Sequence, residues 1–283
     1  MKKGTTAFQN LRFLKHCVTH EVFPLWNLLV GFPREKEEVY QKYLHDLPLL
    51  RHLPPPSSVL PVRFDRYSPY FALAEEYGLD LEPFDFYAFT YPFRKESLAN
   101  LAYSFTDHHF QADYIVQLAN WLDKMNEKVQ QWRRAWWPRE TWVVWGTWFQ
   151  SDRPKLILNQ QGNDTLIYDS RSGEPLEYQI SDLSKQLLNY LNQPLKKADL
   201  AAKFLHISHL DIEQEIAFLQ DRGPLFQEDE RFMSLVLPDE VSISPTASET
   251  LEKRQGERNK LRDLAVVPLA PETHPKKGHP LAN

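Results

Sequence analysis

The 283-residue sequence contains a single cysteine, Cys17, and this scarcity excludes several classes of protein. One thiol cannot form an internal disulfide framework or a zinc site of the Cys-x-x-Cys type. It also cannot hold an iron–sulfur cluster alone, because such clusters need several thiolates. We therefore expect no metal site built from this chain's own residues.

Long apolar runs and excess positive charge are also missing. No run reaches the roughly 18 residues that a membrane-spanning helix needs. The N-terminal MKKGTTAFQN has no apolar stretch behind its lysines, so it does not match a signal peptide. The net charge of −5 provides no basic field for nucleic acid. We expect a cytoplasmic protein that binds neither membrane nor nucleic acid.

Glycine is scarce as well, at 9 residues, whereas proline reaches 21 and aromatic residues make up 13%. Many prolines with few glycines indicate rigid, extended connections instead of flexible hinges. This composition identifies no function by itself.

The first 50 residues predict a helix, a buried strand and a second helix. Thr5 or Thr6 is placed to cap a helix that runs to about His20. Val22 to Val30 is a nearly continuous apolar run, as expected for a strand buried on both faces. Glu35 to Leu50 has an acidic start and apolar residues at helical spacing.

A rigid connector, HLPPPSSVLP, separates this part from a further predicted strand. Val62 to Tyr67 alternates apolar and polar residues, and Ser68-Pro69 ends the pattern. Helix, strand, helix, connector and strand form a βα succession, which is typical of a parallel sheet or barrel. We interpret residues 1–95 as the last part of such an α/β fold.

Residues 96–153 predict a helical, tryptophan-rich connecting region. We expect two helices from Glu96 to Trp137, separated near Asp107-His108-His109. After Pro138, the aromatic-rich stretch Thr141 to Phe149 predicts a strand.

Residues 154–238 predict a small α+β domain of the winged helix-turn-helix pattern. Two strands flank the turn QQGND, and a third strand, Glu177 to Ile180, follows. Three helices come next, and the last stops at Gly223-Pro224 before a closing hairpin. Residues 239–283 are polar and without sustained apolar periodicity, which predicts a disordered tail.

The sharpest motif is WNLLVGFPRE, followed about thirty residues later by VRFDRYSPYF. A buried strand that ends in Gly31-Phe32-Pro33 can bring backbone close to a ligand at the C-terminal face of a barrel. Spacing alone favours a simpler interpretation, a tight strand-to-helix turn with no ligand, because short glycine motifs occur often by chance.

The order of segments carries a family resemblance. GTTAFQNLRFLK, LWNLLVGFPRE, LPLLRHLPPPSSVLPVRFDRYSPYF and a Phe- and Tyr-rich stretch resemble the C-terminal part of the cobalamin-binding radical-SAM enzymes that mature ribosomally made peptides. The resemblance runs clearly over residues 4–105 and more loosely to about Phe149. Such enzymes are generally C-methyltransferases, and they use a 4Fe-4S cluster, S-adenosylmethionine and methylcobalamin. It implies a partial radical-SAM (β/α) barrel in residues 1–95.

The resemblance also implies which residues lie near S-adenosylmethionine. The positions nearest the cofactor would be Asn27, Gly31, Phe32, Pro33 and Glu35. The end of the next strand would face the same cavity with Asp65, Tyr67 and Ser68. The chain departs from the family pattern at Arg34, where glycine is usual, and arginine does not adopt a positive φ cheaply.

The larger departure is the lack of the cluster motif CxxxCxxC, of a cobalamin domain and of the first barrel half. We therefore expect the C-terminal portion of a peptide-maturation enzyme, inactive without a partner chain or segment that carries the missing half. A longer protein, a split enzyme and a decayed remnant all agree with the sequence. The alternative from another class is a non-catalytic peptide-binding scaffold built on a relic barrel.

The winged-helix pattern of residues 154–238 has two possible meanings. Its third helix carries Glu213, Glu215 and Asp221, and an acidic helix would repel the phosphates of DNA. The segment order is instead similar to leader-peptide recognition domains of peptide-maturation systems.

In those domains a precursor peptide adds as an extra strand at a hairpin edge. Tyr168, Tyr178 and Ile180 would then lie near the bound peptide. The alternative is a small structural domain that packs on the barrel and binds nothing.

Overall fold

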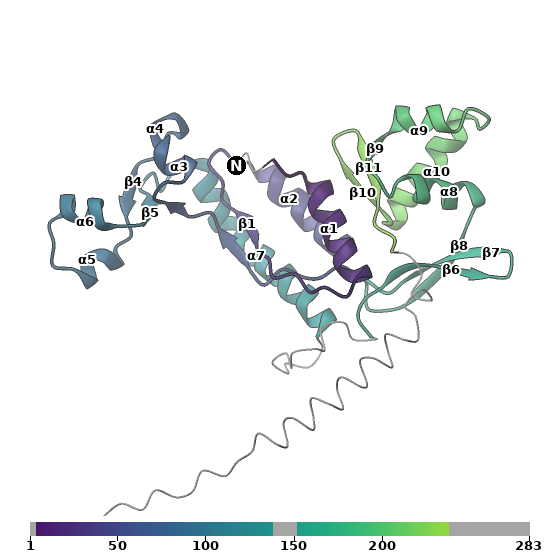
Figure 1. The fold of residues 1–283 in the computed structure, drawn as a ribbon, viewed down its shortest axis with the longest axis horizontal. Coiled ribbons are helices and arrows are strands. Elements are labelled where there is room, and N and C mark those ends of the chain that lie inside the picture. Colours follow the sequence, from purple (N-terminus) through teal and green to yellow (C-terminus); the bar gives the residue numbers. More distant parts are fainter. Residues whose placement is uncertain (1–3, 138–151, 238–283) are drawn as a thin grey trace, which may run out of the picture. The chain divides into compact units, whose positions relative to one another are not determined.

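The computed structural model describes residues 4–137 and 152–237, which all fall in one compact unit, Met1–Pro238 (Figure 1). The described part is mixed α/β, with helices and sheets of two or three strands. It contains no closed barrel. The predicted strand at 141–149 and the predicted tail at 239–283 lie outside the described residues.

Helix α1 (Ala7–Thr19) confirms the first predicted helix and its cap. The Thr6 hydroxyl accepts a hydrogen bond from the Gln9 N–H, and the Gln9 side chain accepts one from the Thr6 N–H. This reciprocal capping box satisfies two backbone donors that a helix N-terminus leaves free. One face of α1 is buried, and it includes a lysine, Lys15, among apolar residues.

A parallel pair of strands follows α1. Strands β1 (Leu28–Val30) and β2 (Val59–Pro61) pair in parallel with Leu28 opposite Val59. They are linked by α2 (Glu37–Asp46) and the 3₁₀ turn η1 (Leu47–Leu50). The predicted βα succession is therefore present, but the long strand expected from Val22 is reduced to three residues. Proline within that run, at Pro24, cannot donate to a ladder.

Of the strand expected at Val62 to Tyr67, only β3 (Phe64–Asp65) is present, and it belongs to an antiparallel sheet of order β3-β5-β4. Strand β2 lies in the preceding stretch, which the sequence predicted to be a rigid connector. The antiparallel sheet includes β4 (Leu81–Pro83) and β5 (Ser104–Asp107). Four short helices surround it: α3 (Pro69–Ala72), α4 (Ala74–Tyr77), α5 (Phe86–Thr90) and α6 (Lys95–Leu101).

The two helices expected between residues 96 and 137 are α6 and the long α7 (Asp113–Trp136), with β5 between them. Two tryptophans of α7 are core residues. Trp132 and Trp136 are fully buried, and their indole N–H groups donate to the carbonyls of Leu53 and Arg51 at 2.9 and 2.7 Å. The tryptophan-rich helix thus fixes the backbone of the connector that precedes β2.

The part after residue 152 has the strand and helix order expected from the sequence. A sheet of order β6-β7-β8 is formed by β6 (Leu156–Gln161), β7 (Asp164–Asp169) and β8 (Leu176–Ile180). Three helices follow, α8 (Asp182–Tyr190), α9 (Lys197–Lys203) and α10 (His209–Arg222). The closing hairpin of β10 (Leu225–Glu228) and β11 (Arg231–Ser234) pairs with the short β9 (Leu195–Lys196). Gly223 ends α10 at φ +80°, in the left-handed conformation expected of a C-terminal glycine.

Most buried apolar residues belong to one large core. It joins α1, α2 and α7 to β6, β7, α8, α10 and the closing hairpin. Buried polar links accompany this packing. The Arg171 guanidinium donates to the Leu49 and Gly223 carbonyls at 2.8 and 2.9 Å, and His52 Nε2 donates to the Leu235 carbonyl at 2.9 Å. Residues before 137 and after 152 are therefore packed as one body.

Candidate functional site

The Glu35 side chain holds the loop that follows β1 by hydrogen bonds to the loop backbone. One carboxylate oxygen of Glu35 accepts hydrogen bonds from the Gly31 N–H at 2.6 Å, the Phe32 N–H at 3.2 Å and the Tyr40 hydroxyl at 2.8 Å. The Glu35 N–H in turn donates to the Phe32 carbonyl at 2.9 Å. Burial and the Glu35 carboxylate raise the pKa of Tyr40, so its hydroxyl stays a donor at neutral pH.

Two residues of this loop have left-handed backbone conformations. Gly31 lies at φ +77°, and a Cβ there would come within 2.9 Å of Leu118 Cδ2 on α7. Arg34 lies at φ +68°, and its Nη2 donates to the Glu76 carbonyl at 2.9 Å. Arginine thus adopts the conformation that glycine takes easily, at a cost of about 1 kcal/mol that this hydrogen bond helps to offset.

The residues expected at the end of the next strand belong to the other sheet. Asp65 accepts from Arg63 Nη2 at 2.9 Å and from the Ser104 hydroxyl at 2.8 Å. The Ser68 hydroxyl accepts from the Phe71 N–H and caps α3. Tyr67 is 85% exposed, at φ +69°. Asp65 and Ser68 therefore have structural partners of their own.

Of the remaining expected cofactor residues, Asn27 lies apart from Gly31, Phe32 and Pro33. Asn27 is exposed just before β1 and lines an apolar cavity of about 620 Å³ between α1, α2 and the closing hairpin. Gly31 lies four residues further along the strand direction, about 13 Å away at the usual rise per residue. Phe32 and Pro33 are half-buried, and Phe32 packs on the smaller core around Phe64.

These residues do not fit the groups that the family resemblance implies. Cys17 is 3% exposed, and burial raises the pKa of its thiol. Within residues 4–137 and 152–237, no group of three or more His, Cys, Asp or Glu side chains is placed to hold a metal. The backbone donors of the Gly31–Phe32 loop are already bound to Glu35. The described residues therefore supply no set of ligands for a cluster and no free backbone donor at Gly31 and Phe32.

The expected peptide-binding residues lie on the β6-β7-β8 sheet. Ile180 and Tyr178 are on β8, which pairs only with β7 in the described part, whereas Tyr168 is on the central strand β7. Ile180 is buried. The Tyr178 ring packs edge-on against Phe218 of α10 at 6.3 Å, and the Arg222 guanidinium lies 5.1 Å from its centre.

Burial raises the pKa of Tyr178 to about 12, and its hydroxyl has no hydrogen-bond partner among the described residues. Tyr178 and Ile180 therefore anchor β8 on the helices below. The other face of the strand presents Glu177 and Gln179, which are exposed. The outer edge of β8 is the one expected binding feature that is not occupied by another described strand.

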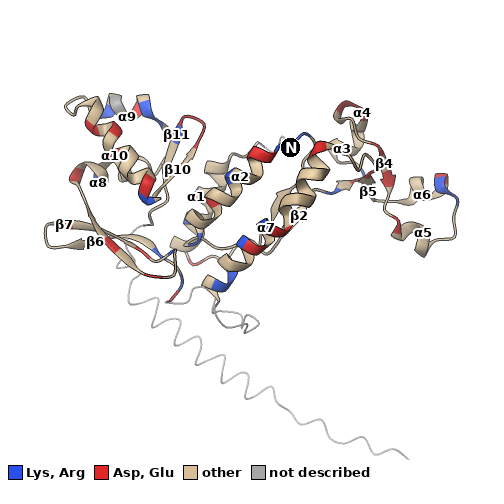
Figure 2. Ribbon diagram, turned by 180° about the vertical axis from the view of Figure 1, so that it is seen from behind, with Lys and Arg blue, Asp and Glu red and all other residues tan. Residues whose placement is uncertain are grey.

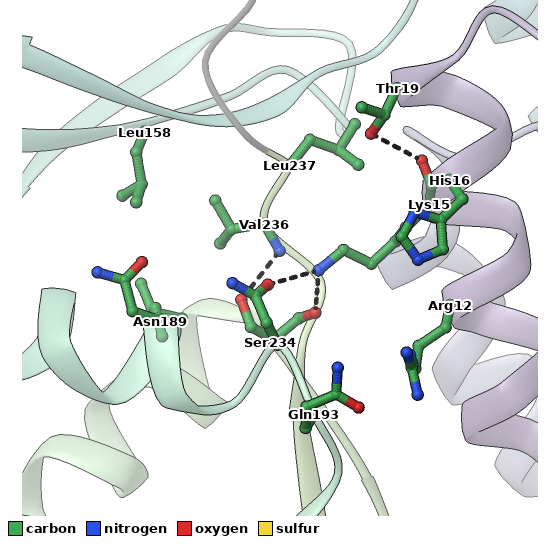
Figure 3. A pocket seen from close by; sticks show the side chains of 12 residues that line it. Arg12, Lys15, His16, Thr19, Leu158, Asn189, Gln193, Ser234, Val236 and Leu237 are labelled. Carbon is green, nitrogen blue, oxygen red and sulfur yellow. Dashed lines mark hydrogen bonds between the residues drawn. The ribbon is translucent and has the colours of Figure 1, made fainter.

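Sequence patterns missed a cationic cavity between α1 and the part after residue 152 (Figure 3). Its volume is about 350 Å³, and its central side chain is Lys15. One signal was present in the sequence. Lys15 follows Leu14 and lies on the same helical face as Leu11 and Val18, so a charged group interrupts an otherwise apolar face.

No family model, curated protein or solved structure matches this chain. The described residues contain no helix that is both long and apolar enough to cross a membrane.

Proposed function

We propose that this chain is the peptide-docking, C-terminal portion of a cytoplasmic peptide-maturation enzyme of the radical-SAM type. In this proposal a precursor peptide pairs with the outer edge of β8, and the cluster and cobalamin chemistry is supplied by other polypeptide. The observation that carries the proposal is the outer edge of β8, which no other described strand occupies, on a sheet anchored by Tyr178 and Ile180. Main-chain hydrogen bonds along such an edge give affinity for an extended peptide.

Two further features support the enzyme part of the proposal. The β1-α2-β2 unit is parallel, as in the barrels of the family that the sequence resembles. Arg34 holds a left-handed conformation in the loop where that family usually has glycine. The loop shape is therefore compatible with the family, although the Glu35 contacts leave no free backbone donor at Gly31 and Phe32.

Those Glu35 contacts favour a second candidate, a non-catalytic peptide-binding scaffold. Glu35, Asp65 and Ser68 each have partners inside the chain, so each is explained by local structure. In the scaffold proposal the β8 edge still binds peptide, but no catalytic partner joins.

Peptide docking is tested by photo-crosslinking on the full chain. A benzophenone amino acid placed at Gln179, on the β8 edge, should crosslink to peptides selected from a phage-displayed random library. The matched control carries the same group at Gln161, which is exposed on β6. Equal crosslinking at the two positions, or none at Gln179, would contradict docking at β8.

The two candidates separate on cofactor binding. We expect the chain, treated with iron and sulfide, to form no cluster, because it has one buried thiol. A stable cluster would contradict that argument. Binding of labelled S-adenosylmethionine when a CxxxCxxC-containing protein encoded beside this gene is added would favour the enzyme portion. If S-adenosylmethionine does not bind in that mixture while peptides still crosslink at the β8 edge, the scaffold is favoured.

A further inference from the structure

The cationic cavity is built from one face of α1 and from residues far along the chain. Arg12, Lys15 and His16 come from α1, whereas Asn192 and Ser234 come from the region after α8 and the end of β11 (Figure 3). Hydrogen bonds join the two sides. Lys15 Nζ donates to the Ser234 carbonyl at 2.7 Å and to Asn192 Oδ1 at 3.3 Å.

The Lys15 ammonium group lies in surroundings that do little to stabilise its charge. The Lys15 residue is 9% exposed, and its two hydrogen-bond acceptors among the described residues are neutral oxygens. An ammonium has three N–H donors, so one is left for a further acceptor. Burial and the nearby Arg12 charge lower the pKa of Lys15 to about 8. A buried cation without a counter-ion is costly, and an anion placed beside it would remove that cost.

Among the described residues, the rest of the lining adds one positive charge, Arg12, and no aspartate or glutamate. Arg12 and the His16 imidazole lie on the same side of the cavity as Lys15. Neither Arg12 nor His16 makes an ion pair within the described ranges. Charge complementarity therefore points to an anionic ligand.

The other side of the cavity carries an aliphatic patch beside the amides of Asn189, Asn192 and Gln193. Leu158 of β6 and the pair Val236-Leu237 belong to this patch (Figure 3), and Leu188 of α8 also lines the cavity. A fully hydrated dianion would lose its water against such a patch without replacement, whereas an alkyl chain would gain by burial. The cavity, at about 350 Å³, is large enough for a small ligand.

We propose that this cavity binds a small aliphatic carboxylate, with its carboxylate on Lys15 and Arg12 and its alkyl chain on the leucine and valine patch. The site is separate from the β8 edge, because its lining includes β6 and no residue of β8. Its test is therefore independent of peptide docking.

The experiment titrates the full chain with hexanoate and with its neutral analogue hexanamide. Binding is followed by NMR of the lysine side chains and by calorimetry. Hexanoate should bind at least about tenfold more tightly than hexanamide, and it should shift the Lys15 resonance. Lys15→Met and Arg12→Met should each weaken hexanoate binding by about tenfold. The matched control Lys36→Met, which removes an exposed lysine outside the cavity, should leave binding unchanged.

Three results would overturn the proposal. Hexanamide could bind as tightly as hexanoate, inorganic phosphate could bind as tightly as hexanoate, or Lys36→Met could weaken binding as much as Lys15→Met. If Lys15→Met fails to fold, the half-buried Arg12→Met variant and the Lys15 resonance in the unchanged protein still decide the question.

Discussion

The two hydrophobic cores of this chain differ in how they use aromatic residues. The large core buries Trp132 and Trp136 completely, and their N–H groups donate to backbone carbonyls. The small core consists of Phe64, Tyr70, Leu79, Ala102, Phe105 and Tyr114, and most aromatics around it stay exposed. Phe89 is 89% exposed and Phe93 54%. An aromatic-rich sequence therefore forms a deep core only where long helices can cover it.

A polar residue supports the small core instead. Asp107 is 3% exposed and accepts hydrogen bonds from the Asp80 N–H at 2.9 Å, the His109 N–H at 3.1 Å and the Tyr114 hydroxyl at 2.6 Å. Burial and Asp107 together raise the pKa of Tyr114, which keeps that hydroxyl a donor. The region around the small core thus depends on the Asp107 carboxylate, whereas the large core depends on apolar packing.

The largest effect should come from the large core. Trp132→Ala should lower the free energy of unfolding by about 4 kcal/mol, because it removes a fully buried ring and leaves the Leu53 carbonyl without its donor. Urea unfolding followed by circular dichroism measures this. Trp132→Phe, which keeps an aromatic ring, should lose clearly less. Equal losses would mean that ring packing contributes little.

The next largest loss of stability should be confined to the region around the small core. Asp107→Ala should destabilise residues 64–112 by about 3 kcal/mol, because the buried Tyr114 hydroxyl and two part-buried N–H groups lose their acceptor. Hydrogen exchange should accelerate in β4 and β5 while α1 and β7 keep their protection. Asp107→Asn, which retains acceptor oxygen, is the milder control. Uniform acceleration across the chain would show that the two regions unfold together.

His52 should make the large core sensitive to acid. Complete burial and the nearby Arg171 charge hold the pKa of His52 well below its usual range, so the folded protein keeps it neutral. Below about pH 6.5 the unfolded chain takes up a proton that the folded chain refuses. Stability should therefore fall by about 2 kcal/mol between pH 7 and pH 5. Unfolding midpoints of the protein and of His52→Gln, compared at both pH values, isolate this contribution, which the variant should lack.

The smallest effect should come from the exposed aromatics. Phe89→Ser should change the free energy of unfolding by less than about 0.5 kcal/mol, because the side chain has little to lose on the surface. Thermal melting measures it. A loss close to that of Asp107→Ala would show that Phe89 is packed in solution.

Local patterns predicted the local structure well. The helix that starts after Thr6, the left-handed Gly223 and the closing hairpin all follow from short segments. Strand lengths and sheet partners were harder, because they depend on distant residues. The four residues of β5 were hidden between two helices and pair with β3 and β4.

The candidate site was also hard to predict, because its contacts depend on distant residues. The sequence predicted that the Gly31 backbone could lie close to a ligand, and in the structure the atoms near Gly31 belong to Leu118, nearly ninety positions later. Only the folded chain reveals that Glu35 points back to the loop and that Lys15 meets Ser234. Contacts between residues so far apart leave no periodic signal in one sequence.

The Arg171 contacts have an evolutionary consequence. Its guanidinium is 6% exposed, pairs with Asp169, and also donates to the Leu49 carbonyl on the other side of the shared core. A recombination breakpoint between residues 137 and 152 would separate this arginine from Leu49 and leave apolar surface uncovered on both pieces. The part after residue 152 is therefore not expected to move between proteins by recombination on its own. It is expected to be inherited together with the helices on which it packs.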